Sequence, residues 1–430
     1  MKARHFLLLA GVGVLLVVPA ILSQGLVNAS IQMLIAALFA CAYNLLCGQA
    51  GMLSFGHAAY FGVGAFATIH AMNAINGTGL LPTPLMPLAG AAGGLVFGVV
   101  AGYFSTKRSG TYFAMITLAV AELVHSLAPH LKGLVGGEAG LSATRMPAWG
   151  LDFGSTNQVY YLTLAWVLAC LGALYLFTLT PLGRLALGLR ENTHRLGFLG
   201  YDTHRLKIMV FAISAMFSGI AGGLQVVSNE AANYIVFDAS LSAAVVLNTY
   251  IGGINVFLGP ALGAALMTFF GYAVSDLTQS WLLYQGTLFV LVMMFMPTGL
   301  AGLAGTVRRL KDQFGAAAAT PVIVLALACA LLLAAGIVFA VELLQRVLSQ
   351  DYQALAVAAS GQWPPIKLFG RTWAPGAALT WGIPLGLLAL GTVAGVATRA
   401  LLRTLTLRAE AAIDNEDKPD AGTERARATS

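Results

Sequence analysis

Charged side chains are scarce in this sequence of 430 residues. Asp, Glu, Lys and Arg make up 9% of the chain, whereas an ordinary soluble domain has about 25%. The 102 residues from position 5 to position 106 contain none of these four types, and hydrophobic residues account for 58% of the whole chain. No soluble core needs such a run, so the composition excludes a soluble protein and predicts a polytopic membrane protein.

Cysteine is also rare, and no Cys-x-x-Cys pair occurs. The four cysteines lie in apolar runs, so we interpret them as buried packing residues and not as disulfide or metal chemistry. They are Cys41, Cys47, Cys170 and Cys329. The histidines His57, His70 and His125 lack the short spacing of metal ligands, so we expect no metal site.

Apolar runs close to the 20 residues that span a bilayer recur along the chain. We expect an all-α polytopic fold with about ten core transmembrane helices, some of them broken, and two extra helices at the C-terminal end. The first run follows two basic residues in the manner of a signal peptide, and we expect it to remain as an uncleaved helix. The expected spans are 6–22, 31–47, 52–72, 84–104, 110–131, 157–179, 208–228, a broken pair within 239–276, 282–303, 321–343 and 375–398.

The basic residues predict the orientation. With the N-terminus inside and one crossing per span, 18 Lys and Arg residues fall inside and 5 outside, which sum to the 23 in the chain. Lys and Arg collect on cytoplasmic loops, so this split places both termini in the cytoplasm. The net charge of +6 then reflects topology, and we expect no nucleic-acid partner.

Glycine interrupts two of the apolar segments, one in each half of the chain. The interrupting glycines are Gly48, Gly51 and Gly56 in the first and Gly252, Gly253 and Gly259 in the second. Glycine relaxes the backbone, and Pro260 removes a backbone donor, so continuous helices are not expected there. Paired broken segments indicate a transport pathway. Tight packing of small residues between helices is the alternative interpretation.

The segment 180–207 is the most informative polar stretch. Thr180 followed by Pro181 predicts a helix N-cap and first helical position, and Gly200 predicts the stop. On a helix the polar face would hold Arg184, Glu191, His194 and Arg195, and the apolar face Leu185, Leu189 and Leu196. Such a helix could dock in a groove of a partner protein. A surface helix lying among lipid headgroups is the alternative.

Polar side chains within the expected spans are candidates for a translocation pathway. They are Ser54, His57, Tyr112, Thr117, Glu122 and Asn248. Glu122 and His125 share a helix face, and a carboxylate there is costly unless it faces a cavity or has a partner. Glu122 would therefore line the pathway or pair with a substrate ammonium; a buried Glu–His pair is the alternative. For His57 a packed, hydrogen-bonded role is equally compatible.

Long, ordered motifs between about residues 30 and 305 resemble the LivM-type permease subunits of branched-chain amino-acid ABC importers. The first signature is Tyr43-Asn44-Leu45-Leu46, then Gly48 to Gly51 and Leu53-Ser54-Phe55-Gly56-His57-Ala58-Ala59. The second is Gly110-Thr111-Tyr112-Phe113-Ala114-Met115-Ile116-Thr117-Leu118-Ala119. The coupling loop is matched by Arg190-Glu191-Asn192, Leu199-Gly200-Tyr201, Lys207 and Phe211, and the second half by Gly252-Gly253, Gly259-Pro260-Ala261-Leu262-Gly263 and Pro297-Thr298-Gly299-Leu300.

The resemblance implies a division of labour. A second, LivH-type permease would pair with this chain, two ATP-binding cassette subunits would dock on its cytoplasmic loop, and a periplasmic solute-binding protein would deliver the solute at a bacterial inner membrane. The coupling residues implied are Arg184, Arg190, Glu191, Asn192, Arg195 and Gly200. The chain has no Gly-x-x-x-x-Gly-Lys-[Ser/Thr] phosphate loop. We therefore expect no cofactor in this chain, with ATP and Mg on the partner subunits.

The C-terminal part departs from the family pattern. We expect a permease core at 1–305, an extension with two transmembrane helices at 306–400, and a disordered cytoplasmic tail at 401–430, where acidic residues alternate with Ala, Thr and Ser. The extension would be a stabilising, lipid-facing appendage or a contact for a partner.

The expected function is the permease of an ATP-driven importer for branched-chain amino acids, an amide, urea or a related small solute, moved by alternating access. A stand-alone secondary transporter or channel could also use broken helices and a buried carboxylate. A membrane enzyme would need a cluster of reactive side chains, and the spans hold none.

Overall fold

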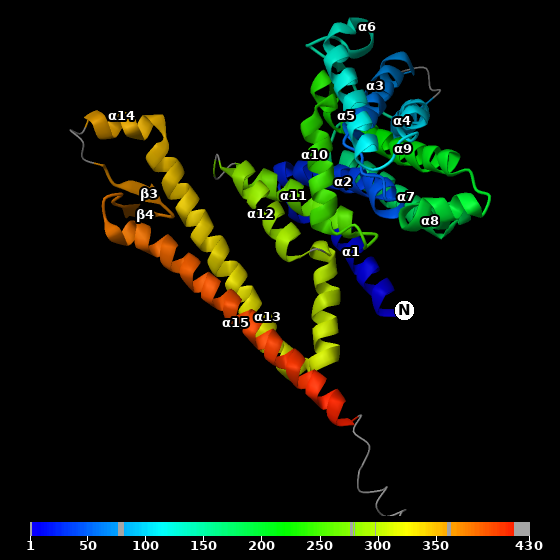
Figure 1. The fold of residues 1–430 in the computed structure, drawn as a ribbon. Coiled ribbons are helices and arrows are strands. Elements are labelled where there is room, and N and C mark those ends of the chain that lie inside the picture. The colour runs from blue at the N-terminus through cyan, green and yellow to red at the C-terminus, as the bar shows by residue number, and fades with distance from the viewer. Residues whose placement is uncertain are drawn as a thin grey trace, which may run out of the picture. The chain divides into compact units, whose positions relative to one another are not determined.

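The computed structural model describes residues 2–75, 81–275, 278, 280–296, 298–358 and 363–416 (Figure 1). The chain divides into two compact units. One comprises residues 1–274 and 287–302, and the other comprises residues 275–286 and 303–430. The first unit contains every candidate site residue named above.

The first unit is built almost entirely of helices. They are α1 (Lys2–Ile21), α2 (Gln24–Asn44), α3 (His57–Ile75), α4 (Pro87–Ser105), α5 (Thr111–Leu127), α6 (Lys132–Val135), α7 (Thr156–Leu179), α8 (Pro181–Phe198), α9 (Thr203–Asn229), α10 (Ala239–Gly252), α11 (Gly259–Ser275) and the greater part of α12 (Trp281–Phe295). Shorter elements are a π-helix η1 (Leu45–Gln49), the 3-10 turns η2 (Thr83–Leu85), η3 (Ala128–His130) and η4 (Tyr234–Phe237), and the strands β1 (Leu141–Ser142) and β2 (Ala231–Ala232).

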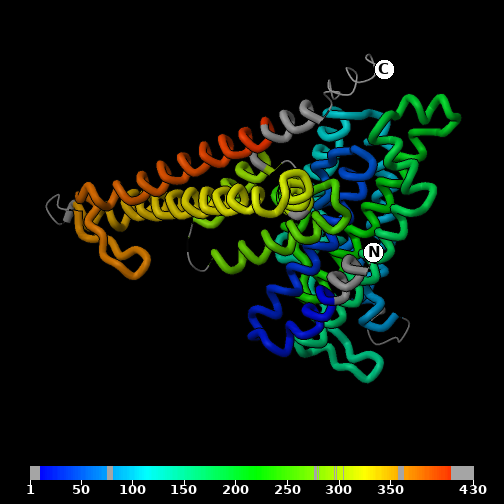
Figure 2. Tube along the Cα trace, turned by 90° about the horizontal axis from the view of Figure 1, so that it is seen from below, coloured from blue at the N-terminus to red at the C-terminus, as the bar shows by residue number. Residues whose placement is uncertain are grey.

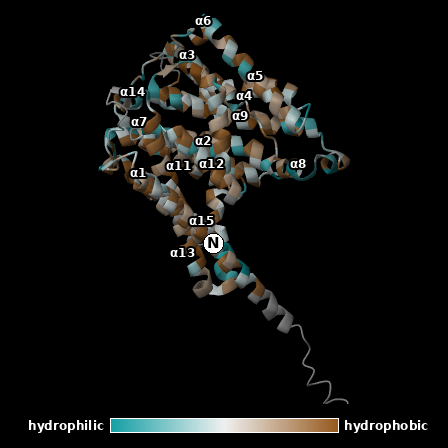
Figure 3. Ribbon diagram, turned by 60° about the vertical axis from the view of Figure 1, so that its left-hand side comes forward, coloured by the Kyte–Doolittle hydropathy of each residue, from teal (hydrophilic) through white to brown (hydrophobic). Residues whose placement is uncertain are grey.

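The prediction of an all-α polytopic membrane protein is confirmed. Among the described residues, seven helices are long and apolar enough to cross a membrane: 24–49, 83–105, 111–130, 156–179, 203–229, 299–348 and 378–407. Four shorter helices are also apolar, namely 10–21, 239–252, 259–275 and 281–294. Hydrophobic residues recur along the helices, as the brown segments of Figure 3 show.

Glycine brings three helices of the first unit into close contact. On α9, a Cβ at Gly219 would overlap the carbonyl oxygen of Gly90 in α4, and one at Gly222 would overlap the carbonyl oxygen of Phe61 in α3. Gly64 on α3 in turn lies against the backbone of Gly219. In lipid, where no hydrophobic drive brings helices together, this backbone-to-backbone packing is the main source of helix association.

Segments predicted to share one side of the membrane lie together. The hydroxyl of Thr106, after α4, lies 3.2 Å from Nδ1 of His204 at the start of α9. At the other ends of the helices, β1 pairs with β2 in antiparallel register, and the guanidinium of Arg145 lies 3.3 Å from the carboxylate of Glu230. The fold thus has two polar ends, each made of the loops that the charge pattern assigns to one side.

The second unit contains a long helical hairpin (Figures 1 and 2). Its elements are most of α13 (Gly299–Leu348), then α14 (Gln350–Ala358), the antiparallel strands β3 (Ile366–Leu368) and β4 (Arg371–Trp373), and α15 (Ala378–Glu416). The helices α13 and α15 approach closely at glycines: Gly336 meets Leu388, and Gly391 meets Leu333. Cys329 also donates from its thiol to the carbonyl oxygen of Gly391, 3.1 Å away.

Three features of this region differ from the expected boundaries. Segment 275–286 groups with the second unit and not with the core, and within it the Tyr284 hydroxyl donates to Glu342 over 2.8 Å. Helix α13 has one non-helical residue, Gly315, with φ 79°, where a loop was expected. Helix α15 runs to Glu416 through the start of the tail predicted to be disordered, because Ala, Leu, Arg and Glu favour helix there. Pro297 and residues 417–430 lie outside the described residues.

Candidate functional site: the coupling helix and the two helix breaks

The first break lies between α2 and α3, as the glycines predicted. The chain leaves α2 through the π-helix η1, which contains Gly48, and then runs without regular structure to the start of α3 at His57. Gly51 has φ +69°, a backbone conformation that other residues rarely adopt. We call residues 45–56 the first break.

The second break separates α10 from α11 at residues 253–258, also as predicted. Gly253 has φ +106° and packs against the backbone of Thr298 and Gly299. Helix α11 then begins at Gly259, with Pro260 in its first turn, where the missing N–H costs nothing. We call residues 253–258 the second break.

The two breaks touch each other. The side-chain amide of Asn44 donates to the carbonyl oxygen of Ile254 over 3.4 Å. A Cβ on Gly48 would lie 2.8 Å from the same oxygen. The sequence predicted each break separately, but their direct contact appears only in the tertiary structure.

The amphipathic helix predicted after Thr180 is α8. The Thr180 hydroxyl accepts from the backbone N–H of Gly183 over 3.1 Å, and Pro181 occupies the first turn. Leu189 and Leu196 are buried together with Leu206 of α9. The predicted polar side chains Arg184, Glu191, His194 and Arg195 are all exposed.

Helix α8 contains a break that its sequence did not reveal. Asn192 has φ −159° and ψ 98°, and its side-chain oxygen accepts from the backbone N–H of Arg195 over 3.0 Å. Asn192 therefore caps a second helical piece that ends at Phe198. The chain then turns at Gly200, with φ +87°, and leaves the Phe198 ring 91% exposed.

Arg190 differs from its neighbours on α8 because its guanidinium is bound within the chain. Nη1 donates to the carbonyl oxygen of Gly48 over 2.6 Å, and Nη2 donates to Oδ1 of Asn255 over 3.1 Å. The resemblance implied that Arg190 is a coupling residue. In the structure Arg190 is exposed like its neighbours and in addition contacts both breaks.

Ser54 and His57 belong to a buried network that joins the first break to α9. Nδ1 of His57 lies 3.0 Å from the Ser54 hydroxyl, and Nε2 lies 2.9 Å from the Ser214 hydroxyl. Ser214 donates its proton to the carbonyl oxygen of Ala42 over 2.7 Å, so it accepts from Nε2–H, and Nδ1 accepts from Ser54. His57 is fully buried, and this arrangement uses both ring nitrogens in packing the bundle.

Thr117 ties α5 to the same break. Its hydroxyl donates to the carbonyl oxygen of Ala114 over 2.8 Å and accepts from the backbone N–H of Phe55 over 3.2 Å. A Cβ on Gly56 would overlap the carbonyl oxygen of Thr117. Glycine at position 56 thus permits the contact between α5 and the first break.

Two of the remaining pathway candidates lie on the exposed face of α5. Tyr112 is 70% exposed, and Glu122 is exposed without an ion pair to His125 among the described residues. His125 instead lies 5.9 Å from the Tyr234 ring, measured between ring centroids. Asn248, by contrast, is buried in α10, and its side-chain oxygen has no hydrogen-bond partner among the described residues.

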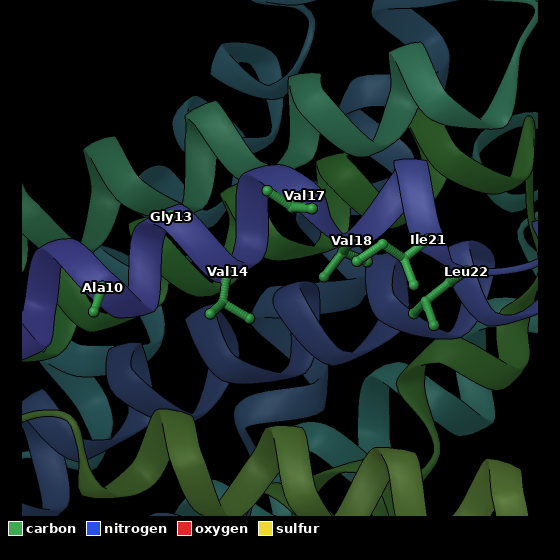
Figure 4. Close-up of a pocket in the computed structure, with 7 residues that line it drawn as sticks. All are labelled: Ala10, Gly13, Val14, Val17, Val18, Ile21 and Leu22. Carbon is green, nitrogen blue, oxygen red and sulfur yellow. The ribbon is translucent and has the colours of Figure 1, made fainter.

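A hollow along α1 does not form a solute site. Six residues of that helix and Leu22, which follows it, line the hollow, and Figure 4 labels them: Ala10, Gly13, Val14, Val17, Val18, Ile21 and Leu22. None of these side chains has a polar atom that could orient a charged or hydrogen-bonding solute. The apolar lining of the hollow is suited to contact with lipid tails.

Ser214 and Asn255 were not predicted as functional residues. Ser214 lies in the apolar helix α9, and a buried hydroxyl among apolar residues is a weak signal by itself. Asn255 follows Gly252-Gly253 closely, so a polar residue inside a glycine break could have drawn attention to it.

These features define a class of protein: a polytopic membrane permease with broken helices and a polar helix at one end. Residues 25–297 match the family described as branched-chain amino acid transport system, permease component. The match covers more than half of the chain, so the chain belongs to this family and is of the LivM type. Transport and not enzymatic catalysis is the activity of its relatives.

Curated relatives agree with this assignment. The chain is 27% identical to the high-affinity branched-chain amino acid transport system permease protein LivM of Salmonella typhimurium and to its counterpart in Escherichia coli, over 68% of this chain and 74% of each relative. It is 24% identical to BraD of Pseudomonas aeruginosa, over 62% of this chain and 91% of that protein. No solved structure matches the chain significantly.

Proposed function

We propose that this chain is the permease subunit of an ATP-driven importer that moves branched-chain amino acids, or an amide, urea or similar small solute, by alternating access. The family match over residues 25–297 carries the proposal, because the relatives are named as permease proteins of high-affinity branched-chain amino acid transport systems. The two contacting helix breaks support it, since broken helices at membrane depth are typical of transport pathways.

The energy would come from two ATP-binding cassette subunits that dock on α8. ATP and Mg would bind to those partner subunits. The exposed side chains Arg184, Glu191 and Arg195 offer charge for that contact, and the exposed Phe198 ring offers an apolar anchor. A second, LivH-type permease and a periplasmic solute-binding protein would complete the importer. The chain would lie in the bacterial inner membrane with both termini cytoplasmic.

The exposed face of α5 is our candidate for the pathway wall. The outward residues of α4 include Leu95, Val99 and Phe104, which suit lipid. The outward residues of α5 include apolar Met115 and Leu123, but also Tyr112 and the carboxylate of Glu122, and a carboxylate facing lipid tails is costly. Water or a permease partner must therefore cover this face, and Glu122 would attract the ammonium group of a solute.

The experiment is uptake of radiolabelled leucine by cells that express the transporter, with amides and urea as competitors. Uptake should stop when ATP is depleted while the proton gradient is held constant. If uptake persists under those conditions, the chain works as a secondary transporter or channel, and the proposal is wrong. The solute class is identified by which competitor, an amide or urea, lowers the uptake of leucine.

A further inference from the structure

One side chain of α8 holds both helix breaks at once. The Arg190 guanidinium donates through Nη1 to Gly48 in the first break and through Nη2 to Asn255 in the second, over 2.6 and 3.1 Å. We call this pair of hydrogen bonds the Arg190 bridge. The polar face of α8 is thereby joined to segments 142 and 65 residues away in the sequence.

Arginine suits this position chemically. Its planar guanidinium has five N–H donors, so it can reach two acceptors in different directions, while lysine is a single point charge. The Gly48 carbonyl lies at the C-terminal end of the α2–η1 helix, where the last carbonyl groups lack helical partners and a positive charge is favourable. A charged donor also makes the stronger and shorter kind of hydrogen bond.

The backbone brings α8 directly against the first break. A Cβ on Gly51 would lie 3.0 Å from Cγ and 3.2 Å from Cα of Arg190. Because Gly51 also has φ +69°, any other residue would be strained there and would press α8 away. The second break lies against the first, because Asn44 and Gly48 both contact the carbonyl oxygen of Ile254.

Helix α8 packs on the bundle on both sides of its break at Asn192, through Leu189 before it and Leu196 after it. Arg190 lies between these two contacts and makes the Arg190 bridge, and the helix ends at the exposed ring of Phe198. A displacement of α8 therefore reaches both helix breaks through Arg190.

We propose that Arg190 is the positioning residue that couples movement of α8 to both helix breaks. When partner subunits close on ATP and displace α8, the Arg190 bridge moves the first and second breaks together. Arg190 itself touches no solute and no ATP. This inference rests on the proposed function, because it assumes that the displacement of α8 is driven by ATP.

The test compares Arg190→Ala with Arg205→Ala in the complete transporter, purified with its own ATP-hydrolysing subunits. Arg205 is an exposed arginine near α8 that pairs only with the exposed Asp202 among the described residues, so its variant should behave as wild type. Arg190→Ala should keep normal subunit yield and ATP hydrolysis but lose about tenfold in uptake per ATP hydrolysed, within the range of allosteric couplings.

Hydrogen exchange measures the coupling directly. In wild type, a non-hydrolysable ATP analogue should change exchange in 181–189, 44–52 and 253–258. Arg190→Ala should keep the change in 181–189 and lose the other two. Asn255→Ala, which removes one arm, should lower the change in 253–258, where the contacts of Ile254 with Asn44 and Gly48 remain, and should leave the change in 44–52 intact. Arg190→Lys should resemble Arg190→Ala, because it keeps the charge but not the two-way donor.

The outcomes separate the two proposals. If Arg190→Ala retains normal uptake per ATP and both breaks still respond to the analogue, Arg190 does not couple them and the inference is wrong. If Arg190→Ala also disrupts assembly, the Asn255→Ala exchange pattern decides the question alone. If wild-type uptake needs no ATP, the proposed function has failed before Arg190 is in question.

Discussion

A carboxylate on a membrane helix must be hydrated or paired, and Glu122 is exposed on α5 without an ion-pair partner among the described residues. The sequence left two interpretations open, a pathway residue and a buried Glu–His pair. In the structure Glu122 and His125 form no ion pair among the described residues, and the His125 ring lies against Tyr234. A solute-facing role for Glu122 stays a prediction, and its physical basis is that a lone carboxylate costs least on a hydrated face.

We predict that Glu122→Gln lowers uptake at least about tenfold without lowering membrane insertion, because it removes the charge that attracts an ammonium group. Uptake and the amount of inserted protein are measured together. Glu138→Gln is the matched control, since Glu138 is an exposed carboxylate of the loop after α6 and should leave uptake unchanged. Equal uptake by wild type and Glu122→Gln would assign Glu122 a structural role.

His57 shows how burial decides between two interpretations that a sequence leaves equal. Both ring nitrogens are used, by Ser54 and Ser214, and the ring is surrounded by Tyr43, Tyr60 and Phe211. The structure thus places this histidine in the packed interior between the first break and α9. Its partner Ser214 is 157 residues away, which no local pattern could indicate.

At the level of the helices, glycine has two structural effects. In the breaks it permits unusual backbone angles, as at Gly51 and Gly253. In α3, α4 and α9 it permits backbone contact within regular helices, as at Gly219 and Gly222. The sequence weighed pathway against packing for the glycine-rich segments. The structure shows close packing at glycines of the breaks as well, as at Gly56 and Gly252, and a pathway role for them stays a prediction.

We expect Gly222→Ala to lower the free energy of unfolding by about 1–3 kcal/mol, the usual cost of forcing extra atoms into a packed core. The new Cβ would overlap the carbonyl oxygen of Phe61. Gly172→Ala on α7 is the control, since a Cβ there meets nothing within 4 Å and alanine favours helix. Thermal denaturation in detergent compares them; equal stability of the two variants would contradict this account of α9.

For the whole molecule, the separation of the two polar ends matters most. Thr106 meets His204 at one end, and Arg145 meets Glu230 at the other. Each contact joins two loops that the distribution of basic residues assigns to the same side. The contacts therefore agree with the expected grouping of the loops into two sides, and a labelling experiment is needed to assign the cytoplasmic one.

Cysteine labelling tests this orientation. A membrane-impermeant thiol reagent should label Glu138→Cys in cells whose outer membrane alone is opened, and should label Arg184→Cys only after the inner membrane is broken. Both positions are exposed. Because Cys41, Cys47 and Cys170 are buried but Cys329 is half-buried, both variants carry Cys329→Ala, and the chain with that change alone is the control. Labelling of Arg184→Cys in intact inner membranes would reverse the topology.

The sequence alone determined the membrane class, the helix breaks and the polarity of α8. These features follow from residue types within a short stretch: apolar length, glycine and proline in a span, and the spacing of Arg and Leu on a helix. It also placed the cap at Thr180 and the turn at Gly200, which depend on neighbouring atoms only.

Only the tertiary structure decided what the polar residues touch. The resemblance implied a coupling role for Arg190, but its hydrogen bonds to Gly48 and Asn255 depend on how three distant segments pack. The proton arrangement at His57 and the exposure of Glu122 depend on packing in the same way. A hydrogen bond needs its two atoms within about 3 Å, and in a bundle of helices that proximity is set by the whole fold.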